Sequence, residues 1–501
     1  MLIRDAVVWI AGAELLSEEA VAELPQSDVR LADGLIAEVG PGLRPAPGED
    51  VIDADGGMLL PGLHDHHVHL RALAAASASV AAGPPLVSDA AGLAAALRAA
   101  DAELAPGAWL RAVGYHESVA GELDREALDR LLPHRPVRVQ HRTGALWMVN
   151  SLAVARLGLD DSALGSAGRA RVAGAGVEGA GVEGAGAERA GAENDSAERD
   201  GVERDGAGRP TGRLWRMDRW LAERVTGAGG DLGAVSSKAL SFGITGFTDA
   251  TPGATERDLA TLAEEPLAQR LYCMAPAGVS APGGTATGPE KVLLDDDTLP
   301  SLDQLAGRIR GAHEDGRPVA VHCVTRVQLV LTLVALHVAG RHPGDRIEHG
   351  AVIAAGSLAD LRGLTVVTQP HFVVERGGQY AADVPAQDRP DLWRLRSLID
   401  AGVSVAAGTD APFGGADPWH VMRAAVRRPP LFDAREAVSP ASALGLFLGE
   451  PASPGVPRLV ARGRAADLVL LRAGPREALH SLSSDLVAAT LVGGAVSYAG
   501  R

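Results

Sequence analysis

The sequence predicts an α/β protein: a (β/α)8 TIM-like barrel joined to a small composite β-sandwich domain. Its 501 residues, 46% of them hydrophobic, are enough for one domain of barrel size and a second, smaller one. Strand-like apolar runs alternate with helix-length segments through most of the chain, and eight such runs can be counted, as in this barrel. Short strand-like runs separated by Gly and Pro lie at both ends of the chain, which favours a separate β-domain.

The barrel strands are predicted from the apolar runs. The first strand ends at His67, and seven more follow at 244–249, 270–274, 291–294, 319–322, 346–349, 364–368 and 403–407. Helix-length segments lie between several of them, at 301–314, 325–339 and 391–401, and residues 71–104 also have a helical pattern. An open doubly wound sheet is the alternative architecture, but it gives no reason for eight strands.

The predicted domain bounds follow from this count. Residues 61–455 form the barrel domain, and residues 1–60 and 456–501 form the two parts of the β-sandwich domain. The second part contains a hairpin pattern around Gly493-Gly494.

The barrel domain is predicted to carry an insertion at 105–212, between its first and second strands. Within it, residues 172–208 form a degenerate five-residue repeat of Gly, Ala, Val and Glu with almost no large apolar side chains. Such a segment cannot bury enough apolar surface to offset its chain entropy, so we expect it to be disordered.

The formal net charge of −16 argues against nucleic acid or an anionic membrane as a partner, so we expect a small-molecule substrate. No apolar run approaches the ~18 residues of a spanning helix, and the N-terminus lacks the apolar core of a signal peptide. The two cysteines, Cys273 and Cys323, are too few for a disulfide framework. We therefore expect a cytoplasmic protein, and the sequence leaves open whether it forms a homo-oligomer.

A histidine cluster follows the apolar residues at 58–60. The sequence from 58 to 70 is MLLPGLHDHHVHL. Because residues i and i+2 of a strand point to the same side, His67 and His69 present two imidazoles to one face, where both can bind one metal ion. His66 points to the opposite face, and we expect His64 and His66 to stay out of the metal site.

Further side chains of metal-ligand type stand where later barrel strands end, which is where barrel enzymes hold their chemistry. They are His322, His349 and Asp410, and Lys291 opens the strand at 291–294 with an amine that could serve if altered. This repetition at successive strand ends predicts a metal site. Cys323 faces away from His322 and is expected to be buried packing.

At these residues the sequence resembles the amidohydrolase superfamily, in particular the branch that contains N-substituted formamide deformylase (amidohydrolase family 3). The resemblance lies in the motifs at 61–69, 321–322, 346–349, 408–412 and 466–470, and it covers nearly the whole chain except 172–208. Residues 150–151 and 209–212 resemble the motifs that flank this branch's own insertion. Ala145 stands where many relatives carry a histidine.

The resemblance implies a binuclear centre with two zinc ions. Its first ion would be held by His67, His69 and Asp410, and its second by His322 and His349. Lys291 would be carboxylated and bridge the two ions, since only a carbamate offers a metal its oxygens; an ordinary ion-pairing lysine is the alternative. Histidine and carboxylate ligands suit zinc. Asp410 would act as general base.

The predicted function is metal-dependent hydrolysis of a non-peptide carbon–nitrogen bond in an amide, formamide or cyclic amide. Four further polar residues near strand ends are predicted to contact the substrate: His116, His141, Arg142 and His371. Two alternatives stay open. One is a mononuclear zinc deaminase of an aminated ring, which has no use for Lys291, and the other is a catalytically inactive relative that binds without turnover.

Overall fold

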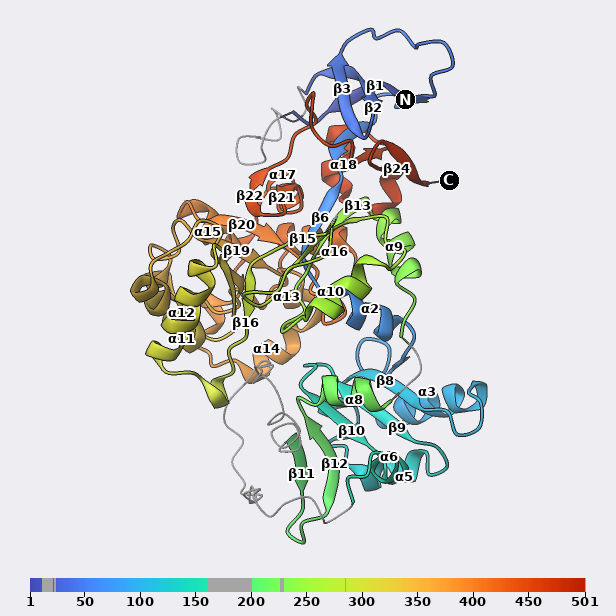
Figure 1. The fold of residues 1–501 in the computed structure, drawn as a ribbon, viewed down its shortest axis with the longest axis vertical. Helices are drawn as coiled ribbons and strands as arrows, with labels where there is room; N and C mark the ends of the chain where they lie inside the picture. The colour runs from blue at the N-terminus through green and yellow to red at the C-terminus, as the bar shows by residue number, and fades with distance from the viewer. Residues whose placement is uncertain (11–20, 22–23, 161–200, 226–228, 284, 501) are drawn as a thin grey trace. The chain divides into compact units, whose positions relative to one another are not determined.

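The computed structural model describes residues 1–500 except 11–20, 22–23, 161–200, 226–228 and 284 (Figure 1). The chain divides into two compact units. The main unit comprises Met1–Leu70 and Leu232–Arg501, and the insertion unit comprises Arg71–Asp231. Within the described ranges, no helix is long and apolar enough to cross a membrane. The predicted domain bounds stay a prediction.

Among the described residues, the main unit contains two all-parallel sheets with nine strands in total. The first sheet consists of β6 (Leu63–Val68), β13 (Ile244–Asp249), β14 (Arg270–Cys273) and β15 (Ala286–Thr287). The second sheet consists of β16 (Glu290–Val292), β17 (Val319–Cys323), β18 (Arg346–His349), β19 (Thr365–Thr368) and β20 (Ser404–Ala407). All eight predicted barrel strands are present within a few residues of their expected bounds, and the two-residue β15 is additional.

Backbone hydrogen bonds join the two sheets at both of their edges. Beyond β20, the amide of Asp410 donates to the carbonyl of His67 at 2.7 Å. At the other edge, the amide of Ala275 donates to the carbonyl of Pro289 at 3.3 Å. Gly408 permits the first junction, because a Cβ at this position would lie 2.5 Å from the Cβ of His67. The two segments that carry the predicted ligands of one ion are therefore held side by side.

Two long helices cover the second sheet. They are α11 (Leu302–Glu314) and α12 (Arg326–Ala339), and each begins with a capping box, formed by Ser301 and Thr325 with the glutamines three residues later. Their apolar faces share one core with β16 to β19. The predicted helices at 301–314 and 325–339 are confirmed. The helix predicted at 391–401 is shorter, since α15 spans Leu395–Asp400 and Trp393 before it has a left-handed φ of 51°.

The two ends of the chain share one mixed sheet in the order β25-β24-β23-β5-β1-β2-β3, with β4 beside β1. Its strands are β1 (Leu2–Val8), β2 (Gln26–Ala32), β3 (Leu35–Gly40), β4 (Val51–Asp53), β5 (Met58–Pro61), β23 (Leu468–Leu471), β24 (Val487–Val492) and β25 (Ala495–Ala499). Gly493 and Gly494, with φ of 57° and 79°, form the predicted two-residue hairpin turn. The sandwich arrangement of this sheet stays a prediction.

The insertion unit is built on a six-stranded sheet in the order β11-β12-β10-β9-β8-β7. Its strands are β7 (Val80–Ala81), β8 (Leu110–Tyr115), β9 (Val137–His141), β10 (Leu146–Val149), β11 (Val202–Arg204) and β12 (Pro210–Trp215). Its helices are α3 (Ala90–Glu103), α4 (Glu117–Ala120), α5 (Arg125–Leu131), α6 (Ser151–Arg156) and α8 (Asp218–Arg224). Strands β7, β8 and β9 run parallel, whereas the others pair antiparallel.

Two expectations for this part of the chain need correction. The helical pattern at 71–104 is broken: α2 (Leu70–Ser77) and α3 are separated by β7 and a loop, because Pro84-Pro85 cannot continue a helix. The prediction of disorder over 172–208 is wrong at its C-terminal end, because Val202–Arg204 forms β11 and pairs with β12. Val202 packs against the apolar core of this unit. Residues 172–200 of that segment lie outside the described residues.

The remaining helices and strands of the main unit connect these sheets. They are α9 (Leu232–Ser241), α10 (Glu256–Ala263), α13 (Phe372–Glu375), α14 (Gly377–Asp383), α16 (Pro418–Val426), α17 (Pro440–Gly445), α18 (Pro475–Ser481), β21 (Gly449–Glu450) and β22 (Ser453–Pro457). Both chain ends belong to the main unit, and their labels stand near its mixed sheet in Figure 1.

Candidate metal centre

His67 and His69 lie at the end of β6. Their ring centres are 5.4 Å apart. The side chain of His67 is fully buried, whereas that of His69 keeps 14% of its surface exposed. A strand end that is hydrogen bonded on both sides holds the two imidazoles rigidly, as a metal site requires.

Asp410 faces both of these histidines from the segment after β20. Its Oδ1 lies 3.2 Å from Nε2 of His69 and 3.6 Å from Nε2 of His67. One ligand atom from each of the three residues falls within 4.8 Å of the others. Oδ1 is buried and receives no well-aligned hydrogen bond from any described residue. A buried carboxylate oxygen 3.2 and 3.6 Å from two imidazole nitrogens fits a bound cation.

His349 and His322 extend this group along β18 and β17. The ring centre of His349 lies 4.8 Å from that of His67 and 4.5 Å from that of His322. Nδ1 of His349 is 2.9 Å from the amide oxygen of Gln369 and 3.8 Å from Oδ2 of Asp410. The bond to Gln369 requires a proton on Nδ1, which leaves the Nε2 lone pair for a ligand.

Lys291 completes the group of predicted ligands. Its Nζ lies 3.3 Å from Nε2 of His67, and the residue is only 4% exposed. Burial lowers the pKa of the amine to about 8, against the opposing effect of the carboxylates of Glu348 and Asp410. The structure therefore brings all six predicted metal-ligating residues together at strand ends of the main unit.

The imidazoles of His67 and His349 are both neutral near pH 7. Burial, acting with the charge of Lys291, lowers the pKa of His67 to about 4. Burial likewise lowers the pKa of His349 to about 3. The pKa of Asp410 lies well below its usual range: burial alone would raise it, but the histidines beside it outweigh burial. Neutral imidazoles and an ionised carboxylate are the forms that bind metal.

Two residues of this group adopt a backbone conformation that is rare without glycine. His349 has a φ of 69° and Asp410 a φ of 52°. Each such residue costs on the order of 1–3 kcal/mol and is held by its surroundings, and such positions cluster at functional sites.

Glu348 is a residue of the candidate centre that the sequence did not single out. Its carboxylate forms a very short hydrogen bond with Nδ1 of His67 and accepts a second one from Nε of Arg346 at 2.5 Å. Metal-binding histidines usually donate their second ring nitrogen to such a carboxylate. Glu348 thereby fixes the tautomer of His67. The sequence offered one signal for Glu348: Arg346 stands two residues before it in a strand that is buried throughout. Buried charges are usually paired, so such a glutamate is expected to have charged or hydrogen-bonded partners.

Asp65 ties the end of β6 to the Asp410 segment. It accepts hydrogen bonds from the backbone amide and hydroxyl of Thr409 at 3.0 and 2.5 Å and from the amide of His67 at 3.1 Å. Burial raises its pKa to about 6, although these hydrogen bonds oppose the shift. Asp65 is therefore a positioning residue for both ligand segments.

The remaining histidines of the cluster, His64 and His66, have contacts of their own, and their exclusion from the metal site stays a prediction. His64 hydrogen bonds through Nε2 to the hydroxyl of Thr248 at 2.9 Å, and its ring centre is 4.6 Å from that of His66. Cys323 is buried in an apolar core and lies 3.4 Å from the hydroxyl of Thr332.

The predicted substrate contacts fall into two groups. In the main unit, His371 is fully buried after β19, its ring nitrogens have no hydrogen-bond partner among the described residues, and burial lowers its pKa to about 4. In the insertion unit, His116 and His141 meet at a carboxylate of Glu117. Arg142 follows His141 directly. Substrate binding by these residues stays a prediction.

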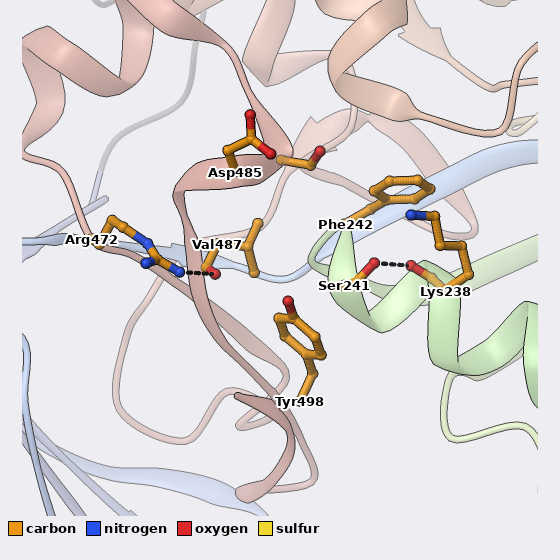
Figure 2. A pocket seen from close by; sticks show the side chains of 8 residues that line it. Lys238, Ser241, Phe242, Arg472, Asp485, Val487 and Tyr498 are labelled. Carbon is orange, nitrogen blue, oxygen red and sulfur yellow. Dashed lines mark hydrogen bonds between the residues drawn. The ribbon is translucent and has the colours of Figure 1, made fainter. Parts of the chain in front are cut away.

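An open hollow of about 300 Å³ lies between α9 and the strands β24 and β25 (Figure 2). There Nζ of Lys238 lies 4.6 Å from the ring centre of Phe242, and Arg472 donates to the carbonyl of Val487 at 3.2 Å. None of the predicted metal ligands lines this hollow, so it is not the candidate centre.

Comparison with known proteins identifies the class. The sequence model of the amidohydrolase family matches residues 50–211 and 251–498. The chain therefore belongs to the amidohydrolase family. It is 24% identical to the N-substituted formamide deformylase of Arthrobacter pascens over 88% of this chain and 86% of that protein, which confirms the resemblance to that branch. The chain is thus a hydrolase that acts on carbon–nitrogen bonds.

Solved structures agree on the fold. An uncharacterized metal-dependent hydrolase from Pyrococcus horikoshii superposes with a TM-score of 0.68 at 16% identity, over 95% of this chain and 98% of that one. A mutant atrazine chlorohydrolase from Arthrobacter aurescens, complexed with zinc and atraton, superposes with a TM-score of 0.53 at 14% identity, over 99% and 94%. The amidohydrolase neighbours imply a TIM-like barrel fold, in keeping with two parallel sheets joined at both edges.

Proposed function

We propose that this chain is a metal-dependent hydrolase of a small amide, formamide or cyclic amide. The observation that carries the proposal is the meeting of His67, His69 and Asp410, whose ligand atoms lie within 4.8 Å of one another. The likeness to an N-substituted formamide deformylase over most of both chains supports an acyl–nitrogen bond as the target.

In this proposal the ligands divide between two zinc ions. His67, His69 and Asp410 hold the first ion, and His322 and His349 hold the second. When bound, the ions lower the pKa of water and polarise the scissile carbonyl. The buried Oδ1 of Asp410, which faces the imidazoles of His67 and His69, and the neutral imidazoles of His67 and His349 fit this use.

Lys291 supplies the bridge between the two ligand sets. A neutral amine adds through its nitrogen to the carbon of CO2 and loses a proton, which leaves a carbamate with two ligand oxygens. The lowered pKa of Lys291 favours this reaction, because only the neutral amine is a nucleophile. Its Nζ lies 3.3 Å from the Nε2 of His67, a ligand of the first ion.

Asp410 acts as the general base. Its carboxylate accepts a proton from the attacking water and returns it to the leaving nitrogen. The depressed pKa keeps the carboxylate ionised before attack. Glu348 holds the imidazole of His67 in orientation, and His371 lies in the same unit for contact with the substrate.

Further parts of the proposal concern the architecture. The eight predicted strands close into a (β/α)8 barrel, and the sheet shared by the chain ends forms a small β-sandwich domain. Cytoplasmic location and a homo-oligomer stay predictions.

A hydrolysis screen of the zinc-loaded chain tests the function. N-substituted formamides, N-acyl amines, cyclic amides and aminated rings are offered, and amine, carboxylate and ammonia are measured. We expect turnover of at least one amide class that disappears on chelation. Release of ammonia from an aminated ring, without cleavage of any amide, would contradict the proposal and favour the mononuclear deaminase. No turnover at all, with bound zinc, would favour the inactive relative.

A further inference from the structure

Two strand ends of the insertion unit bring His116, Glu117 and His141 together. Nε2 of His141 lies 3.0 Å from Oε2 of Glu117, and Nε2 of His116 lies 3.9 Å from the same oxygen. One ligand atom from each of the three lies within 4.8 Å of the others. Their side chains are 20%, 41% and 11% exposed in chain order, so the group is partly desolvated and still open to solvent.

The backbone holds this group in place. Strands β8 and β9 are parallel neighbours, and Tyr115 pairs with His141 in their register. The amide of Arg142 donates to the carbonyl of Tyr115 at 2.8 Å, which joins the two segments beyond the strands. The carboxyl ends of parallel strands are where open α/β sheets bind ligands.

Each of the two histidines has a hydroxyl group beside Nδ1, the ring nitrogen that is not next to Glu117. Nδ1 of His116 lies 2.9 Å from the hydroxyl of Ser118, and Nδ1 of His141 lies 2.7 Å from the hydroxyl of Thr143. Each Nδ1 also accepts the backbone amide of that same hydroxyl residue at 3.2 Å. A cation at both Nε2 atoms therefore requires each ring proton to move to Nδ1. This move breaks the hydrogen bond from the backbone amide to Nδ1, and Nδ1 then donates to the hydroxyl oxygen of Ser118 or Thr143 instead. Metal-binding histidines typically donate such a hydrogen bond from the ring nitrogen that does not bind the metal.

We propose that His116, Glu117 and His141 form a second metal site, for zinc or a similar first-row divalent cation, in the insertion unit. Two imidazoles and one carboxylate are the donor set of known zinc sites, and three protein ligands leave one coordination position open. This proposal gives the two imidazoles a ligand role in place of the substrate contact predicted from the sequence.

The test counts metal on the whole 501-residue chain. After chelation, the chain is equilibrated with Co²⁺ or Zn²⁺, and bound metal is measured by mass spectrometry, with visible absorption for Co²⁺. Glu117→Gln keeps the shape of the side chain but removes its charge, and we expect it to lose about one equivalent per chain. His134→Asn, which replaces an exposed histidine of the same unit, is the matched control and should lose none.

Two further variants keep the test decisive. Thr143→Val removes only the hydroxyl partner of His141, and we expect about tenfold weaker binding of that one equivalent. In a His67→Asn, His322→Asn chain, the equivalent sensitive to Glu117→Gln should remain, which separates this site from the centre of the main unit. An unchanged metal count and unchanged affinity in both Glu117→Gln and Thr143→Val would overturn the proposal.

Discussion

The main unit and the insertion unit both place histidines and a carboxylate where parallel strands end, but they surround them differently. The side chain of Asp410 is 3% exposed, whereas that of Glu117 is 41% exposed. In the main unit, a buried carboxylate, Glu348, supports His67, whereas a hydroxyl supports His141 in the insertion unit. Strand ends supply metal-ligand side chains in both units, and burial with ionic support distinguishes the candidate centre of the main unit.

The largest expected effect is that of Asp410→Asn. The amide keeps the shape of the carboxylate but cannot accept a proton. We expect kcat on the best amide of the screen to fall by ~100-fold or more, with an unchanged circular dichroism spectrum. A folded variant that retains more than about a tenth of the wild-type kcat would show that Asp410 is not the base.

Glu348→Gln tests the ionic support of His67. We expect metal affinity or activity to fall by about 10–100-fold, because the amide holds the imidazole less strongly. Glu290→Gln is the matched control: Glu290 is also buried on a parallel strand and pairs with Arg308 at 2.7 Å, without touching an imidazole. Equal metal affinities in the two variants would argue against a specific role of Glu348.

Gly408→Ala tests the junction of β20 with β6. The added Cβ would lie 2.5 Å from both the backbone nitrogen and the Cβ of His67, so the two segments must separate. We expect a loss of about 1–3 kcal/mol in the free energy of unfolding, together with weaker metal binding. Gly307→Ala in α11 is the control, since nothing lies within 4 Å of its added Cβ, and it should stabilise by about 0.5–1 kcal/mol. Normal metal binding in Gly408→Ala would show that metal binding does not depend on the close junction of β20 with β6.

The lysine bridge predicts a pH dependence. Burial lowers the pKa of Lys291 to about 8, so the neutral amine forms as the pH rises through this value. Its population grows about tenfold between pH 7 and pH 9. Recovery of activity by the metal-free chain, after addition of zinc and bicarbonate, should accelerate by about this factor, when measured at fixed dissolved CO2. A rate independent of pH would argue against carboxylation of Lys291.

Much of the fold was predictable because its signals are local. The apolar runs located eight of the nine parallel strands in the two parallel sheets of the main unit, and the Ser301 and Thr325 boxes mark the starts of α11 and α12. The spacing of His67 and His69 predicted a shared face. Pro84-Pro85 is a local signal for the break before α3 that the helical pattern at 71–104 overlooked. The strand at Val202–Arg204 could not be predicted, since it depends on pairing with β12 that local composition does not show.

The support of the centre could not be predicted from local signals. Glu348 and His67 are 281 positions apart, and they meet only when the edges of the two sheets join. The left-handed backbone of His349 and Asp410 is likewise imposed by the surrounding fold. Glu117 stands next to His116 in the sequence, but its meeting with His141 depends on the pairing of β8 with β9.

The most direct test of the central claim is the number of metal ions at the main unit. The count is made in a Glu117→Gln background, so that the insertion unit contributes none. We predict two equivalents per chain, and we predict that Lys291→Ala lowers this number and the activity together, with partial recovery of activity by short carboxylates. One equivalent that Lys291→Ala leaves unchanged would contradict the binuclear account and favour the mononuclear alternative.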